Sequence, residues 1–146
     1  MGAKGYAPAM ATTLFTRIIE GEIPCHKVYE DPQVFAFLDI GPLAPGHTLV
    51  IPKHPVERLE DLSEDSAAAL GRALPRIARA VLAASGAADY HVIQKNGASA
   101  GQVVPHVHFH IIPKFTDQGL GVTWKPGELS SDDGRTMAAK IVERLA

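Results

Sequence analysis

The chain has 146 residues, the size of one ordinary domain, and its 14 Lys and Arg residues nearly balance 16 Asp and Glu residues. The formal net charge of −2 predicts no broad basic surface, which argues against nucleic acid and anionic membranes as partners. Although 46% of the residues are hydrophobic, no uninterrupted apolar stretch approaches the roughly 20 residues that span a membrane. We therefore expect a domain that buries its own core and binds any anionic ligand through local geometry.

The single cysteine, Cys25, excludes an intramolecular disulfide, and the N-terminus lacks the basic-then-apolar pattern of a secretory signal. Together these two observations predict a cytoplasmic protein. Residues 1–10 are rich in Ala and Gly and contain Pro8, so we expect a flexible N-terminal segment there. Residues 11–146 have the length and composition of a single domain.

The first part of this domain predicts one short helix followed by three strands. Apolar residues at helical spacing over residues 11–21 indicate an amphipathic helix that Gly21 ends. Two β-branched and aromatic runs, residues 26–30 and 34–39, flank a short turn and predict an antiparallel hairpin. Residues 47–51 predict a third strand, which ends before a proline.

The central part of the chain predicts one long helix. Ser63 is a good N-cap, acidic residues occupy the first turn, and the helical pattern continues to Gly86. Pro75 falls inside this helix, where its ring crowds the carbonyl of Gly71 and removes one backbone hydrogen bond, so we expect a kink. The apolar stripe of the helix consists of Leu70, Leu74, Ile77 and Val81.

The last part of the chain predicts two more strands and a final helix. The strands are expected at residues 90–95 and 105–112, and Pro113 is expected to end the second of them. Residues 114–130 predict an irregular surface segment, and residues 131–145 predict a helix that begins with Ser and two Asp residues. The sum is an α+β fold, with a five-stranded, mainly antiparallel sheet, one long helix packed on it and short N-terminal and C-terminal helices.

Three histidines alternate along the last predicted strand, at His106, His108 and His110. Because side chains alternate along a strand, the three imidazoles share one face, while Val107 and Phe109 point toward a core. Neighbouring histidines on that face stand roughly 6.5–7 Å apart, close enough for all three to contact one phosphate-sized group. Each imidazole has two polar ring nitrogens that need partners, so three of them are a poor choice for a purely structural core.

Two kinds of chemistry suit such a run, because histidines bind zinc or copper and also perform nucleophilic and acid–base work on phosphate. A zinc site usually draws on carboxylate partners and often on cysteine, and neither lies near this run. Asn96, Gly97, Gly101 and Gln102 precede the run instead, and their amides suit hydrogen bonds to a phosphate or leaving group. Phosphoryl or nucleotidyl transfer is therefore favoured over a metal-binding function.

The pattern of residues 106–112, with His, apolar, His, apolar, His, apolar, apolar, resembles the histidine triad (HIT) superfamily of nucleotide hydrolases and transferases. Further segments resemble this family in the same order along the chain, and together they cover about residues 12–115. The resemblance therefore implies the HIT-like form of the predicted α+β fold. These further segments are residues 14–15, 18–24, 36–40, 46–54, 96–97 and 100–102.

The resemblance implies that His108 attacks the α-phosphorus of a purine nucleotide conjugate and forms a covalent nucleotidyl-histidine, which water hydrolyses to a nucleoside monophosphate. It also implies that His106 and His110 orient the site and contact phosphate oxygens. His47, on the neighbouring strand, is expected to stabilise the phosphoryl group. The substrate class is expected to be adenosine phosphoramidates or dinucleoside polyphosphates, and no cofactor is implied.

Binding residues are implied by the same resemblance. Asn96 and Gln102 are expected to bind the phosphate or leaving-group side, and Asp39 is expected to accept hydrogen bonds from the ribose hydroxyls. Five apolar residues are expected to form the cleft for the base, although each of them also suits an ordinary core position on a helix or strand. The cleft for the base is expected to consist of Phe15, Ile18, Phe37, Ile40 and Leu49.

Two features depart from the family's pattern. Some members carry a Cys-x-x-Cys pair near the N-terminus that binds zinc with two histidines, whereas this chain has Thr13 and Thr16. Because neutral hydroxyls are poor zinc ligands, His54 and His106 lack co-ligands, and we predict no metal. Val103 occupies a position where some branches carry Ser or Thr, and valine cannot donate a proton toward an amine leaving group.

These observations favour a cytoplasmic nucleotide hydrolase or nucleotidyl transferase. The alternative is a non-catalytic protein that binds purine nucleotides for regulation, because an intact histidine triad permits turnover without proving its use. The resemblance further implies a two-fold homodimer in which the long helix and residues 90–95 face the partner.

Overall fold

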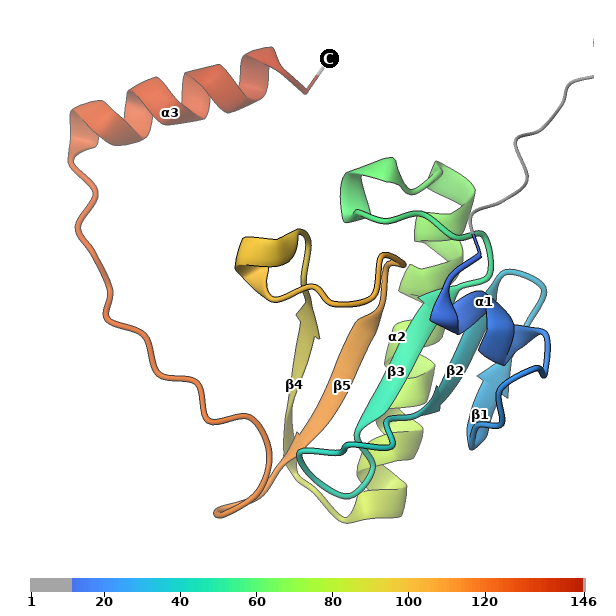
Figure 1. The fold of residues 1–146 in the computed structure, drawn as a ribbon. Helices are drawn as coiled ribbons and strands as arrows, with labels where there is room; N and C mark the ends of the chain where they lie inside the picture. Colours follow the sequence, from blue (N-terminus) through green and yellow to red (C-terminus); the bar gives the residue numbers. More distant parts are fainter. Residues whose placement is uncertain (1–11, 146) are drawn as a thin grey trace, which may run out of the picture.

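The computed structural model describes residues 12–145, which form one antiparallel sheet with helices on both faces (Figure 1). The strands lie in the order β1-β2-β3-β5-β4. The predicted α+β class is confirmed, and the predicted flexible segment, residues 1–10, lies outside the described residues. The elements are α1 (Leu14–Ile19), β1 (Lys27–Glu30), β2 (Val34–Leu38), β3 (Thr48–Pro52), the 3-10 helix η1 (Leu59–Asp61), α2 (Glu64–Ser85), β4 (Asp89–Gln94), the 3-10 helix η2 (Ala98–Ala100), β5 (Phe109–Lys114) and α3 (Ser131–Glu143).

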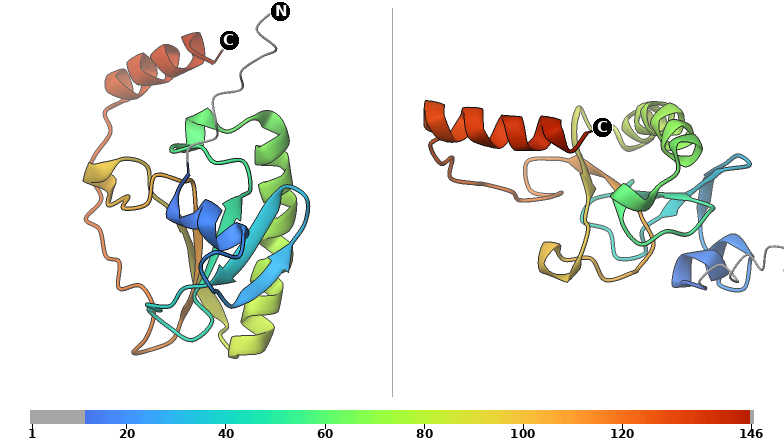
Figure 2. Two further views of the ribbon diagram at one scale, coloured as in Figure 1. Left: turned by 45° about the vertical axis from the view of Figure 1, so that its right-hand side comes forward. Right: turned by 90° about the horizontal axis from the view of Figure 1, so that it is seen from above.

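Each face of the sheet carries its own apolar core, because side chains alternate along the strands. The long helix α2 covers one face, and the short helix α1 lies against the other (Figure 2). His110 pairs with Leu49 of β3 and therefore shares the α1 face of the sheet. The core beneath α2 includes Val34, Ala36, Val50, Leu70, Ile77 and Ile111. The core beneath α1 includes Phe15, Ile18, Phe35, Phe37, Leu49 and Ile51.

The long helix begins and ends where the sequence predicts. The hydroxyl of Ser63 accepts a hydrogen bond from the Ser66 N–H at 3.0 Å, and Gly86 ends the helix in the left-handed conformation, with a φ of 77°. α2 is helical throughout Glu64–Ser85, with Pro75 inside it, and the kink expected at Pro75 stays a prediction. Both Pro75 and Gly71 are exposed, so water reaches the carbonyl that loses its partner.

The last strand begins four residues later than predicted, at Phe109. The N–H of His106 bonds to the Val104 carbonyl at 2.9 Å, and the N–H of Val107 bonds to the Val56 carbonyl at 2.8 Å. The His106 N–H therefore closes a turn and the Val107 N–H bonds to the segment before α2, so neither group pairs with a strand of the sheet. Pro113 lies within β5, although the sequence predicted that it would end the strand. Its missing N–H is tolerated because the pairing of β5 with β3 stops two residues earlier.

The remaining strand ends agree with the sequence to within one residue, and the C-terminal helix begins at Ser131 as predicted. Residues 115–119 form a bend after β5, in which the Gly119 N–H bonds to the Leu43 carbonyl at 3.0 Å. Residues 120–130 form an extended arm, and α3 stands apart from the sheet (Figures 1 and 2). None of the α3 residues is buried against the rest of residues 12–145. Within the same residues, no helix is both long and apolar enough to cross a membrane.

Candidate active site

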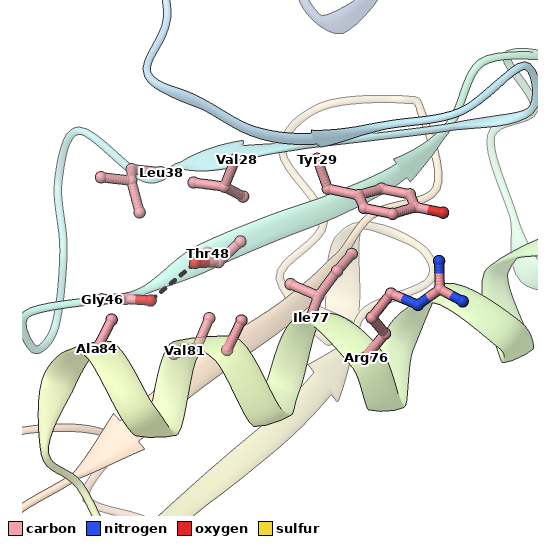
Figure 3. A pocket seen from close by; sticks show the side chains of 10 residues that line it. Val28, Tyr29, Leu38, Gly46, Thr48, Arg76, Ile77, Val81 and Ala84 are labelled. Atoms are coloured by element: carbon pink, nitrogen blue, oxygen red, sulfur yellow. Dashed lines mark hydrogen bonds between the residues drawn. The ribbon is translucent and has the colours of Figure 1, made fainter.

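Two cavities of similar size lie on opposite faces of the sheet. The helix-side cavity, about 260 Å³, lies between α2 and strands β1 to β3 and is mostly apolar (Figure 3). Its polar groups are Tyr29 and Arg76 at one end and the Thr48 hydroxyl, which donates to the Gly46 carbonyl at 2.8 Å. The histidine cavity, about 280 Å³, lies beside α1 and is lined by His108 and His110. Groups that react with phosphate are thus found in the second cavity.

The histidine cavity brings together most of the residues predicted to bind a nucleotide. Its lining combines a largely apolar wall with one carboxylate and two imidazoles. The predicted members are Phe15, Ile18, Phe37, Asp39, Ile40, Leu49, His108 and His110. The members that were not predicted to belong to the cleft are Leu14, Ile23, Pro24, Cys25, Leu38 and Val104. Most of these lie in irregular segments without periodicity, where the sequence carries no signal for a shared surface.

His106 is fully buried, and both of its ring nitrogens are hydrogen-bonded. Its Nε2 lies 2.8 Å from the Pro52 carbonyl oxygen, and because a carbonyl only accepts, Nε2 carries the proton. Nδ1 of the neutral ring therefore accepts a hydrogen bond, which the Thr13 hydroxyl donates at 2.8 Å. Thr13 also accepts from the Thr16 N–H at 3.1 Å, which caps α1. One hydroxyl thus fixes the helix start and the His106 ring.

His108 is oriented by the backbone of His106. Its Nδ1 lies 2.7 Å from the His106 carbonyl oxygen, so Nδ1 carries the proton and Nε2 carries the lone pair. Nε2 has no hydrogen-bond partner among residues 12–145, and the His108 ring lines the histidine cavity. Phe15 packs edge-on against this ring with a centroid separation of 5.0 Å. The arrangement presents an unprotonated nitrogen to anything bound in the cavity.

His47 and His110 form a second hydrogen-bonded pair. The N–H of Leu43 donates to Nδ1 of His47 at 3.1 Å, so the proton of the neutral His47 ring lies on Nε2. Nε2 donates to Nδ1 of His110 at 2.9 Å, which leaves the proton of His110 on its own Nε2. Within residues 12–145 that group has no partner. It is therefore a donor available to a phosphate oxygen.

Asp39 stands beside this pair at the end of β2. One carboxylate oxygen accepts from the Gly41 N–H at 2.8 Å, and the other lies 3.5 Å from Nε2 of His47. Because a carboxylate has about four acceptor sites, lone pairs remain for the hydroxyl groups of a ligand. Asp39 thus lines the cavity and also lies beside the pair formed by His47 and His110.

Asp39, His47 and His110 also bring three potential metal-ligand atoms within 4.8 Å of one another. A metal bound at Nε2 of His47 would need the lone pair of that nitrogen. The Leu43 N–H requires the lone pair of Nδ1, and a neutral imidazole has only one unprotonated nitrogen. The hydrogen bonds therefore favour a proton between His47 and His110 over a metal.

All four site histidines are held in the neutral form. Burial lowers the pKa of His47, against the attraction of the nearby Asp39 carboxylate, and burial also lowers the pKa of His106 and His108. Burial, followed by repulsion from His108 and His47, lowers the pKa of His110 to about 4. A neutral His108 at physiological pH is the form that acts as a nucleophile.

Acid is expected to destabilise the fold through these histidines. Between pH 6.5 and about 4, an unfolded His110 binds a proton that the folded ring rejects, so the free energy of unfolding falls as the pH falls. The His110 contribution reaches about 3 kcal/mol, at 1.36 kcal/mol for each pH unit of the shift. Urea unfolding from pH 7 to pH 4 should show a smaller loss for His110→Gln than for the wild type. Parallel curves for the two proteins would contradict this explanation.

Asn96 and Gln102, predicted to bind phosphate, do not line the histidine cavity in this structure. The Asn96 amide oxygen accepts from the Leu59 N–H at 2.8 Å. Gln102 accepts from the Gly97 N–H at 2.7 Å and donates to the Glu57 carbonyl at 2.7 Å. Both amides brace the loop that carries η2 against the segment before α2. A direct role in phosphate binding stays a prediction.

The structure shows the surroundings of the three positions that depart from the family's pattern. Thr13 bonds to His106 and Thr16 bonds to the Thr13 backbone, so these two hydroxyls form a local hydrogen-bond network. His54 is exposed. Val103 is 89% exposed and offers no donor, whereas its neighbour Val104 lines the histidine cavity.

Comparison with known proteins finds a matching family, similar sequences and similar solved structures. The model of the HIT domain family matches residues 20–117. Adenosine 5'-monophosphoramidase hnt1 of Schizosaccharomyces pombe is 38% identical over 133 residues, which cover 90% of this chain and 97% of that protein. Adenosine 5'-monophosphoramidase HNT1 of Saccharomyces cerevisiae is 43% identical over 142 residues, which cover 95% of this chain and 87% of that protein. The crystal structure of a HIT family member from Bacillus subtilis aligns with a TM-score of 0.89 at 39% identity, covering 93% of this chain and 99% of that chain.

Proposed function

Because the chain belongs to the HIT family, we propose that it is an enzyme that hydrolyses or transfers the nucleotidyl group of purine nucleotide conjugates. The observation that carries this proposal is the orientation of His108, whose unprotonated Nε2 lines the cavity because its Nδ1–H is bonded to the His106 carbonyl. The yeast relatives named adenosine 5'-monophosphoramidase support a reaction at the α-phosphorus. A cytoplasmic location is part of the proposal and is supported by the free Cys25.

The proposed reaction has two displacement steps. In the first, the lone pair of Nε2 of His108 forms a bond to the α-phosphorus, and the bond to the leaving group breaks with its electron pair on the leaving group. The His106 carbonyl continues to accept the Nδ1–H of His108, which offsets the positive charge on the substituted ring. In the second step, water attacks the phosphorus, the bond to Nε2 breaks, and the nucleoside monophosphate is released.

His110 and His47 are proposed to stabilise the charge that builds up on the phosphoryl oxygens. The Nε2–H of His110 is the available donor, and His47 holds it in this tautomer through the bond between the two rings. Such donors act strongly in a site that excludes water. His106 is proposed to position the nucleophile through its carbonyl, because both of its ring nitrogens are already bonded within the protein.

The nucleoside is proposed to occupy the apolar part of the histidine cavity. Phe15 and Phe37 lie edge-on to each other at 5.6 Å and form a rigid aromatic wall, and Ile40, 89% exposed, forms part of the rim. Asp39 is proposed to accept the ribose hydroxyls with its remaining lone pairs. The base, sugar and α-phosphate would then follow one another from this wall to His108.

A direct assay tests the proposal. The protein is incubated separately with an adenosine phosphoramidate and with a dinucleoside polyphosphate, and the release of nucleoside monophosphate is measured. Release from at least one substrate is the expected result. Absence of release from both, together with retained nucleotide binding in calorimetry, would favour the alternative of a regulatory nucleotide-binding protein.

We also propose that two copies form a two-fold dimer through β4 and the neighbouring face of α2. β4 is an edge strand, and edge strands present unpaired backbone groups that proteins usually cover. Tyr90 and Val92, which are 40% and 49% exposed, point to the α2 side of this edge. The separate position of α3, with Met137 and Val142 exposed, also supports a partner that receives the arm.

Val92→Lys is expected to convert the dimer into a monomer, because an ammonium group would be buried in a symmetric interface twice. Light scattering coupled to gel filtration should give half the wild-type mass. Val28→Lys is the matched control, since Val28 is 47% exposed on β1, the opposite edge strand, and this variant should stay dimeric. A monomeric wild type would contradict the dimer proposal.

A further inference from the structure

Lys95 follows β4 at the point where the sheet reaches the histidines. β4 and β5 pair antiparallel, with Ile93 opposite His110 and Gln94 opposite Phe109. One further step in this register sets Lys95 opposite His108. Because side chains alternate, Lys95 then shares the sheet face of His108 and His110. Directly opposed residues on one face lie within contact distance of long side chains.

The charge of Lys95 acts on the nucleophile and its neighbour. Burial is the main reason that the pKa values of His108 and His110 are low, and the positive charge of Lys95 lowers both further. The Lys95 side chain runs over Gly101, where a Cβ atom would lie 3.4 Å from Cδ and 3.5 Å from Nζ of the lysine. Gly101 has a φ of +86°, so both its conformation and this contact favour glycine.

No carboxylate within residues 12–145 forms an ion pair with Lys95, whereas Lys27 and Lys53 both pair with Glu30. Lys95 therefore places an uncompensated positive charge beside the histidine cavity, on a chain whose net charge is −2. Lys95 is half-buried, and a positive charge on the same sheet face as a nucleophile suits an anion that arrives with the substrate.

The two substrate classes differ in what their leaving groups need. An amine needs a proton as it departs, and Val103 offers no hydroxyl to supply it. A phosphate leaving group departs as an anion without a proton, and the charge that it gains is stabilised by a nearby cation. Lys95 meets the second requirement.

We propose that Lys95 is a specificity-determining residue, which binds the phosphate oxygens of the leaving group and favours nucleoside 5'-polyphosphate conjugates as substrates. The inference rests on the proposed function and narrows its substrate class. The bond from Nε2 of His108 to the α-phosphorus forms while the bridging P–O bond breaks. The electron pair stays on the departing phosphate oxygen, beside the Lys95 ammonium group.

Lys95→Met tests this role through the ratio of two activities. The kcat/KM for diadenosine tetraphosphate, divided by that for adenosine 5'-phosphoramidate, is expected to fall about tenfold to a hundredfold, the size of one lost charge-assisted hydrogen bond. Lys95→Arg keeps the charge and should keep most of the ratio. Lys140→Met makes the same change of net charge on α3, outside the cavity, and should leave the ratio unchanged.

Equal losses on both substrates would assign Lys95 a structural role and overturn the proposal, as would an unchanged ratio. Ionic strength gives a second readout, because the KM for the polyphosphate should rise with salt more steeply in the wild type than in Lys95→Met. A wild type that turns over neither substrate would instead refute the proposed function. Calorimetry would then still test Lys95, since the variant should lose the preference for ATP over AMP that the wild type is expected to show.

Discussion

Replacing His108 by alanine is expected to reduce the release of nucleoside monophosphate by about a thousandfold or more. Among residues 12–145, His108 alone combines a bonded Nδ1–H with a free Nε2 at the histidine cavity, and the variant lacks this ring. Loss of a covalent nucleophile removes the two-step route, so binding energy alone remains to accelerate the reaction. The measurement is steady-state release of monophosphate from the better of the two substrates.

His91→Ala is the matched control for this change. His91 lies on β4, opposite Ile112, and therefore on the same face of the sheet as His110, but it does not line the cavity. We expect this variant to retain activity within about threefold, since it leaves the bonds of His108 intact. Undiminished release by His108→Ala would show that another group attacks the phosphorus.

Thr13→Val is expected to cost both stability and turnover. The valine keeps the shape of threonine but removes the hydroxyl that donates to Nδ1 of His106, a ring with no exposed surface. An unsatisfied buried acceptor costs about 1–3 kcal/mol, and loss of the α1 cap adds about 1 kcal/mol. A loosened His106 ring also loosens the carbonyl that orients His108, so kcat should fall about tenfold. Urea unfolding and initial rates measure the two effects.

Two companion variants separate the hydroxyl from the cap. Thr13→Ser keeps the oxygen and should retain most of the stability and kcat. Thr16→Val removes the reciprocal half of the capping box, in which Thr16 bonds to the Thr13 backbone at 2.7 Å and 2.8 Å, but leaves the bond to His106. A loss of kcat in Thr16→Val as large as in Thr13→Val would mean that α1 capping alone explains the result.

The sequence predicts those parts of the fold that local periodicity determines. Ser63 and Gly86 fix the ends of α2 through their own cap geometry, so the helix is found within a residue of its predicted bounds. Alternation likewise predicts that Phe109 and Ile111 face the core beneath α2 while His110 faces the other side. The predicted start of β5 was wrong because the Val107 N–H bonds to the Val56 carbonyl instead of to a neighbouring strand. This bond joins segments about fifty residues apart, and local periodicity carries no signal for it.

The candidate site also contains residues that could be predicted from the sequence and contacts that could not. Asp39, His108 and the five apolar residues of the cleft, which the resemblance to the HIT family implied, all line the histidine cavity. The Thr13 bond to His106 joins residues 93 positions apart, and the sequence gives only the residue types of the two partners. Asn96 and Gln102 are amides that suit a ligand or a loop equally well, and only the structure gives their present partners.

The sequence predicts the helix α3 but not where the arm places it. Ser130 caps α3, and acidic residues occupy its first turn, so the helix itself follows from local signals. An isolated helix of 13 residues is marginal in water, and its apolar side chains find no cover within residues 12–145. The position of α3 therefore depends on contacts that a single copy of the chain does not supply.

Trapping of the covalent intermediate tests directly whether His108 is the nucleophile. The protein is mixed with the better substrate, quenched within milliseconds at alkaline pH, digested and analysed by mass spectrometry. We expect a mass increase equal to one nucleotidyl group on the peptide that contains residues 106–110, with fragmentation assigning it to His108. Turnover without any nucleotidylated peptide, or a nucleotidyl group on another residue, would show that His108 is not the covalent nucleophile.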